Sequence, residues 1–383
     1  MARTRPVGPP PGGDPGSVAG ALGTLLAAGA PTEEARIVLK GLLRAFGWDE
    51  SAAAGSGITL AEWAATWLPI QERERRPKTF AGYRSAVTTW LVPTIGDRAL
   101  AALTPADMRA VADALRSAGR AATTARYIQT VLIKMLRDAI VEGHPVPTRV
   151  LTVKRAAQPM NDRTAIPLDQ AMAILRVADR DPDGSQWAAA FLQGLRQGER
   201  LGLTWDCVDL DEGTIDISWQ LQALPFVAER GGPLRVPDDY VHRRLHGALS
   251  LVRPKTGRGR RLIPLVPWMT AALRTWRDVA PDSPHGLVWP RPDGQPVSAK
   301  ADRARWRTLQ DRSGARHPSG RHWVGHEIRH TTATLLMNLG VDESVRMAIL
   351  GHASIDVTRR YQHADLAHAR AALTQAAAAL GLE

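Results

Sequence analysis

Cysteine is almost absent from this sequence, because Cys207 is the only one among 383 residues. A single cysteine excludes an internal disulfide and any zinc site built from cysteines, and it fits a reducing, cytoplasmic setting. Apolar runs long enough to span a bilayer are also missing, so no membrane partner is expected. Residues 17–30, SVAGALGTLLAAGA, imitate an export signal, but their glycines and the preceding Asp14 argue against one.

Negative charge is in deficit. The 49 lysines and arginines outnumber the 38 aspartates and glutamates, which gives a formal net charge of +11 and a sequence pI of about 10.5. This balance predicts a polyanionic partner, most simply nucleic acid. Arginine predominates over lysine, and Ala, Gly and Pro are abundant, as is typical of GC-rich genomes. The arginine content alone is therefore weak evidence for DNA binding.

The length predicts two or three domains. Residues 1–56 read as an N-terminal extension that is partly disordered, and no function is assigned to it. Residues 57–150 read as a helical domain, residues 151–164 as a basic linker interrupted by prolines, and residues 165–383 as a second domain that ends in a helix. The expected fold class is mainly α with a small antiparallel β-sheet (α+β).

Local signals support this division. Leu60, Trp63 and Trp67 recur at helical spacing and predict one buried face, while Thr104 followed by Asp107 predicts the capped start of a later helix. In the second domain, residues 214–219, TIDISW, alternate apolar and polar side chains as a strand does. Residues 247–266 read as a hairpin that turns near Lys255, and residues 222–245 read as irregular.

The stretch ILGHASIDVTRRYQH, residues 349–363, places Tyr361 directly after Arg359 and Arg360. A tyrosine hydroxyl has an ordinary pKa of about 10, and nearby cations favour the phenolate. The same cations would hold a phosphate, which makes Tyr361 a candidate nucleophile for a phosphodiester. From this stretch alone, a surface helix with a half-buried tyrosine is the simpler interpretation.

Arg196, Lys255, His326, Arg329 and His352 are further candidates, although each taken singly also has an ordinary structural interpretation. The segment HEIRH, residues 326–330, also matches H-E-x-x-H, in which two histidines bind zinc and the glutamate acts as a base. A zinc peptidase needs a third ligand. The extended H-x-x-G-x-x-H pattern is absent, and the sequence AILGH stands where a downstream glutamate ligand is usual.

Taken in order, four motifs resemble the phage integrase, or tyrosine recombinase, family over roughly residues 57–370. They are GLRQGERLGLTW, PKTGRGRRLIPL, HEIRHTTATLLMNLG and LGHASIDVTRRYQH. The helical domain resembles the family's core-binding domain. The sequence is especially similar to integrases of actinobacterial phages and integrative elements.

The resemblance implies a role for each candidate. Arg196 and Arg329 match the two catalytic arginines, and Glu199 matches an acidic residue that supports the first of them. Lys255 matches the β-hairpin lysine, His326 the histidine of the H-x-x-R box, and His352 the later position that holds His or Trp. Tyr361 matches the nucleophile. Two departures are present. Glu327 stands where an aspartate is usual, and the segment before Lys255 is longer than in minimal members.

The implied function is a site-specific recombinase that cuts and rejoins DNA through a 3′-phosphotyrosyl intermediate and integrates or excises a mobile element. No cofactor or metal is implied. The implied partners are double-stranded DNA at attachment sites, a homotetramer on two duplexes, and an accessory DNA-bending or directionality factor. The alternatives left open are relaxation of DNA by a type IB topoisomerase, a DNA-binding protein that does not cut, and the zinc metallopeptidase.

The end of the chain carries one narrow apolar stripe. Leu366, Leu373 and Leu380 recur every seven residues in an alanine-rich segment that favours a helix. The stripe must be buried, either on its own domain or on a neighbouring protomer. In the second case, placement of Tyr361 would depend on assembly.

Overall fold

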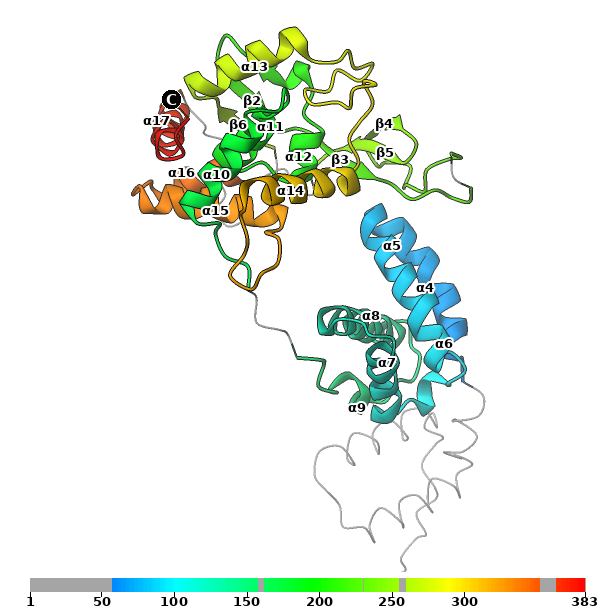
Figure 1. Ribbon diagram of the computed structural model, residues 1–383. Coiled ribbons are helices and arrows are strands. Elements are labelled where there is room, and N and C mark those ends of the chain that lie inside the picture. The colour runs from blue at the N-terminus through cyan, green and yellow to red at the C-terminus, as the bar shows by residue number, and fades with distance from the viewer. Residues whose placement is uncertain (1–56, 158–161, 230, 255–259, 352–362, 383) are drawn as a thin grey trace, which may run out of the picture. The chain divides into compact units, whose positions relative to one another are not determined.

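The computed structural model describes residues 57–157, 162–229, 231–254, 260–351 and 363–382 (Figure 1). The chain forms two compact units: the first comprises residues 57–71 and 82–157, and the second comprises residues 72–81 and the described residues from 162 onward. Each unit has its own hydrophobic core. No helix among the described residues is long and apolar enough to cross a membrane.

The first unit is helical. The elements before residue 157 are α4 (Leu60–Glu74), α5 (Pro77–Ala86), the π-helix η1 (Val87–Leu91), α6 (Val92–Ile95), the 3-10 helix η2 (Leu100–Ala102), α7 (Pro105–Ser117), α8 (Ala122–Val141) and α9 (Thr148–Leu151). The predicted apolar face of α4 is confirmed, because Leu60, Trp63 and Trp67 are buried. Their burial leaves two indole N–H groups in need of acceptors. Trp63 donates to the carbonyl of Met135 at 2.9 Å, and Trp67 donates to Asp138 at 2.7 Å.

The predicted start of α7 is also confirmed. The Thr104 side chain accepts from the backbone N–H of Asp107, and the Asp107 carboxylate accepts from the backbone N–H of Thr104. This reciprocal cap satisfies two N–H groups that a helix start otherwise leaves unpaired.

The second unit combines helices with two small antiparallel sheets, which confirms the predicted fold class. Its helices are α10 (Leu168–Ala178), α11 (Ser185–Leu192), α12 (Gln197–Leu201), η3 (Trp205–Cys207), α13 (Pro267–Val279), α14 (Ala299–Ser313), α15 (Gly325–Asn338), α16 (Glu343–Leu350) and α17 (His363–Ala379). Its strands are β1 (Val208–Asp209), β2 (Thr214–Asp216), β3 (Gln220–Ala223), β4 (His242–His246), β5 (Leu249–Val252) and β6 (Leu262–Pro264).

The strand pairing corrects the predicted hairpin around Lys255. Strands β5 and β6 do not pair with each other: β5 lies between β3 and β4, and β6 pairs with β2. Strand β3 follows β2 closely along the chain. Strands β6 and β5 therefore pair with two successive parts of one stretch of chain, β6 with β2 and β5 with β3. The chain between Val252 and Leu262 therefore links two different strand pairings, and Lys255 lies outside the described residues.

The segment 222–245 is not wholly irregular, because it contains most of β4. Strand β4 turns directly into β5 at Gly247, which has φ +55°, a left-handed conformation that favours glycine. The polar sequence of β4, HRRLH, fits an edge strand with little apolar burial and hides the strand from a hydrophobic pattern search.

The C-terminal helix α17 packs on its own domain, beside α15, α16 and β6 (Figure 1). Leu373 and Leu380 are buried in the main core of the second unit, together with Ala369 and Ala376. Arg370 fastens the helix further by donating to the carbonyls of Leu265, Glu212 and Gly213. Of the two predicted sites for the apolar stripe, the structure shows the one on the same chain.

We expect Leu373→Ala to lower the free energy of unfolding by about 2–5 kcal/mol, because a fully buried leucine would leave a cavity. Gln375→Ala, at an exposed position of the same helix, should change it by less than about 0.5 kcal/mol. Thermal unfolding of both variants measures this. An unchanged midpoint for Leu373→Ala combined with lost recombination would instead place α17 on a neighbouring protomer.

Candidate active site

Arg196 lies at the start of the short helix α12, where Glu199 fixes both its backbone and its side chain. One Glu199 carboxylate oxygen accepts from the Arg196 backbone N–H at 2.9 Å, and the other accepts from Nη1 of Arg196 at 2.7 Å. Glu199 is buried, whereas the Arg196 side chain is 38% exposed. The guanidinium is thus held at its base while part of it remains open to a ligand.

Arg329 reaches the same place from α15. Its Nη1 donates to the carbonyl of Gly194 at 2.5 Å, which ties α15 to the loop that carries Arg196. The side chain is buried, yet within the described chain its Nη2 has no hydrogen-bond partner. Burial, with the charges of Arg196 and Arg261, lowers the pKa of Arg329 to about 9. The guanidinium remains charged at neutral pH, with a donor available for an anion.

The charges in this cluster do not balance. Burial alone would raise the pKa of Glu199, but the adjacent Arg261 and Arg196 guanidiniums lower it to about 2, so this carboxylate is ionised. Among the described residues of this cluster, one negative charge therefore faces the three positive charges of Arg196, Arg261 and Arg329. A buried excess of positive charge with an unused N–H donor is the arrangement that a phosphate stabilises.

His326 precedes Arg329 by three residues on α15, on an exposed part of the helix. Partial burial, the neighbouring His330 and the positive charges of Arg329, Arg163 and Arg196 lower its pKa below the ordinary value of 6.5. At neutral pH the imidazole is therefore mostly neutral and can accept a proton.

Glu327 forms an ion pair and a helix cap, which a glutamate acting as the base of a zinc peptidase would have to break. It is fully buried, accepts from Nη2 of Arg321 at 2.7 Å and from Nη1 at 3.0 Å, and caps α15 at the backbone N–H of Val324. Among the described residues, no cluster of three His, Cys, Asp or Glu side chains is placed to hold a metal ion. The described geometry gives the metallopeptidase alternative no support.

We expect DNA cleavage to be unchanged in the presence of excess EDTA, because the arginines supply the positive charge that a metal ion would otherwise provide. The assay compares the amount of covalent protein–DNA complex formed with and without chelator. Loss of the complex on chelation and its return with zinc would revive a metal-dependent mechanism.

Three predicted site residues, Lys255, His352 and Tyr361, lie outside the described residues. The chain is described up to Gly351, which immediately precedes His352. Gly351 ends α16 with φ +65°, and its carbonyl accepts from Nη2 of Arg196 at 3.2 Å. Arg196 is therefore tied to the backbone from which the segment with His352 and Tyr361 continues.

The sequence interpretation missed a buried support behind α12. Arg200 lies one residue beyond Glu199, pairs with Asp302 of α14 at 2.6 Å, also donates to Gln186 of α11, and lies over the Trp187 ring at 4.3 Å. Gln197 donates to the same aspartate at 2.7 Å. These partners are distant in sequence, so no local motif could have indicated them.

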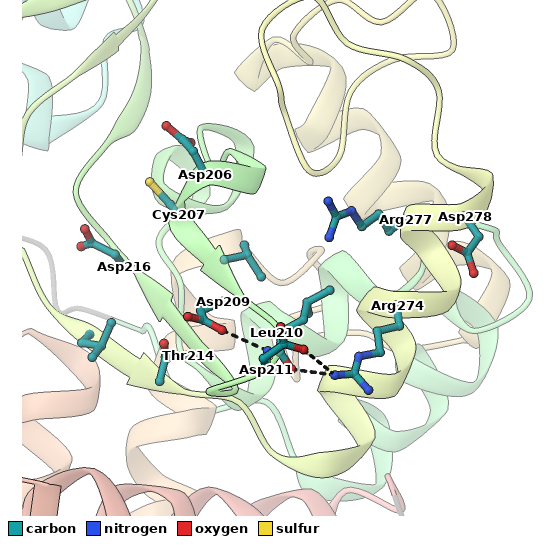
Figure 2. Close-up of a pocket in the computed structure, with 12 residues that line it drawn as sticks. Asp206, Cys207, Asp209, Leu210, Asp211, Thr214, Asp216, Arg274, Arg277 and Asp278 are labelled. Carbon is teal, nitrogen blue, oxygen red and sulfur yellow. Dashed lines mark hydrogen bonds and ion pairs between the residues drawn. The ribbon is translucent and has the colours of Figure 1, made fainter.

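A separate groove of about 840 Å³ lies around β1 and α13 (Figure 2). It shares no lining residue with the arginine cluster. Its lining includes two arginines and five aspartates: Asp206, Asp209, Asp211, Asp216 and Asp278. One of the arginines, Arg274, pairs with Asp211 at 3.2 Å, as Figure 2 shows. The remaining negative charge makes this groove a poor site for phosphate.

The chain is similar to integrases over most of its length. Residues 164–368 match the model of the phage integrase family. The chain is 22% identical over 352 residues to an integrase of Saccharopolyspora erythraea, covering 81% of this chain and 79% of that protein. It is 27% identical over 348 residues to an integrase of Streptomyces ambofaciens, covering 86% and 82%.

Solved structures show the same fold. An integrase of the Tn1549 transposon, in complex with transposon right-end DNA, superposes with a TM-score of 0.63 at 18% identity, covering 83% of this chain and 99% of that one. A lambda integrase tetramer bound to a Holliday junction superposes with a TM-score of 0.59 at 18% identity, covering 88% of each chain.

Proposed function

Because the chain belongs to the phage integrase family, we propose that it is a tyrosine-type site-specific DNA recombinase that integrates or excises a mobile element. The helical residues 57–150 are its core DNA-binding domain, residues 151–164 the linker, and residues 165–383 the catalytic domain. Its substrate is double-stranded DNA at attachment sites.

One observation supports this proposal most strongly: the buried Nη2 of Arg329 has no hydrogen-bond partner among the described residues, while the guanidinium lies among like charges. A buried donor of a charged group that makes no hydrogen bond is costly, so an anion that accepts from Nη2 would stabilise this arrangement. A phosphodiester oxygen provides that anion. Arg196 adds a second guanidinium, and two such forks can hold the non-bridging oxygens.

In this mechanism the Tyr361 oxygen attacks phosphorus, and the bond to the DNA 5′-oxygen breaks. The products are a 3′-phosphotyrosyl link and a 5′-hydroxyl. One phosphoester replaces another, so no external energy source is required. Rejoining is the same exchange with the 5′-hydroxyl of the partner strand as the attacking group.

The other proposed site residues each assist this exchange of phosphoesters. Arg196 and Arg329 stabilise the negative charge on phosphorus-bound oxygens in the transition state, which is typically the largest catalytic contribution. Lys255 gives a proton to the leaving 5′-oxygen, a step worth about 10²–10⁴-fold in rate. Neutral His326 helps to remove the Tyr361 proton, and His352 hydrogen-bonds the phosphate. Glu199 orients Arg196.

The assembly proposed for this chain is a homotetramer on two DNA duplexes. The lambda integrase tetramer on a Holliday junction supports it by likeness of fold. An accessory DNA-bending or directionality factor completes the proposal.

A suicide DNA substrate tests the function. Its nicked strand releases a short 5′-hydroxyl fragment after cleavage, so that rejoining fails and the covalent complex accumulates. A covalent protein–DNA band supports a cutting enzyme, and its absence supports a binding protein that does not cut. Products with exchanged flanks support a recombinase, whereas relaxation of supercoiled DNA without exchange supports a topoisomerase.

A further inference from the structure

Arg261 is a buried arginine that has no role in the mechanism described above. It directly precedes β6, and its side chain is 5% exposed. An arginine is rarely buried without specific partners. Those partners lie on two different elements of the candidate active site.

The first partner is Glu199. Nη2 of Arg261 donates to one carboxylate oxygen at 2.8 Å, and Nη1 donates to the other at 3.1 Å. The same two oxygens accept from the side chain and the backbone of Arg196. The Glu199 carboxylate is therefore held in a two-pronged pair on one side while it holds Arg196 on the other.

The second partner is the end of α16. Nε of Arg261 donates to the carbonyl of Ile349 at 2.8 Å. A Cβ added to Gly351 would lie 3.1–3.3 Å from three atoms of the Arg261 side chain, so the glycine backbone packs directly against the guanidinium. Arg261 thus caps the helix immediately before His352, and a cation is favoured at that helix end.

We propose that Arg261 is a positioning residue for the strand-transfer reaction. It orients Arg196 through Glu199, and it fixes the end of α16 from which the chain continues to His352 and Tyr361. A single planar guanidinium with several directed donors sets both geometries at once, which a lysine cannot do. The effect on the reaction rests on the proposed function, but the positioning itself does not.

Hydrogen exchange measured by mass spectrometry on the full-length chain tests the positioning without DNA. In Arg261→Met and Arg261→Lys, amide exchange should rise at least about tenfold in peptides that cover residues 194–201 and 343–351. Peptides from α13 in the same samples should be unchanged. Unchanged exchange in the two target peptides would overturn the proposal, and so would an equal rise in α13, which would show general destabilisation.

Cleavage of the suicide substrate then tests the consequence. Arg261→Met should form covalent complex about 10–100-fold more slowly, because a displacement of about 1 Å has an effect of that size. The rate of covalent complex formation by Arg261→Lys should lie between those of Arg261→Met and the unaltered chain. The matched control Arg274→Met removes an arginine that is 58% exposed and should react at the unaltered rate.

Combination with Arg196→Ala separates positioning through Arg196 from positioning through the end of α16. If Arg261 acts through Arg196, adding Arg261→Met to Arg196→Ala should slow the residual reaction by less than about threefold. A full 10–100-fold further loss would overturn that route. If the unaltered chain forms no covalent complex, the proposed function fails, whereas the exchange experiment still decides the positioning.

Discussion

Tyr361→Phe is expected to bind DNA with unchanged affinity and to form no covalent complex. The substitution removes one hydroxyl, and that hydroxyl is the proposed nucleophile. Gel shifts measure binding, and denaturing electrophoresis of the suicide-substrate reaction measures the covalent product. The chain offers a matched control in Tyr240→Phe, which removes a phenol from the same domain outside the arginine cluster.

The control variant should react at the unaltered rate. A covalent band from Tyr361→Phe as strong as that from the unaltered chain would show that another residue attacks phosphorus. Loss of DNA binding along with the band would instead give Tyr361 a structural role.

Arg329→Lys should slow covalent complex formation by about 10²–10³-fold, the typical effect of removing one preorganised donor to a developing anion. Lysine keeps the charge but not the fork that bonds Gly194 and leaves Nη2 for the phosphate. Single-turnover kinetics at saturating DNA isolates the chemical step from binding.

Arg312→Lys is the matched control for this variant, because Arg312 is partly exposed and pairs with Asp181 far along the sequence. We expect it to leave the rate unchanged. If Arg329→Lys forms covalent complex as fast as this control, Arg329 does not stabilise the transition state.

Local signals in the sequence predicted local structure well. The cap at Thr104 and the face of Trp63 and Trp67 depend on residues a few positions apart, and both are confirmed. The motifs that resemble the phage integrase family also identified Arg196 and Arg329, which the fold brings to one cluster.

Long-range pairing was not predictable in the same way. An apolar run, a turn and a second apolar run describe the chain on both sides of Lys255, but they do not reveal that β5 and β6 pair with different strands. Arg261 reads as one of several arginines in GRGRRL. Its importance follows from partners about 60 and 90 residues away along the chain, Glu199 and Ile349.

If Tyr361 is the nucleophile, it becomes covalently joined to DNA, and mapping the trapped adduct tests this most directly. The suicide-substrate complex is digested with protease and nuclease, and the nucleotide-bearing peptide is sequenced by mass spectrometry. We predict a nucleotide joined to Tyr361 through its 3′-phosphate and a free 5′-hydroxyl on the released strand. An adduct on any other residue, or a 5′-linked nucleotide, would contradict the account.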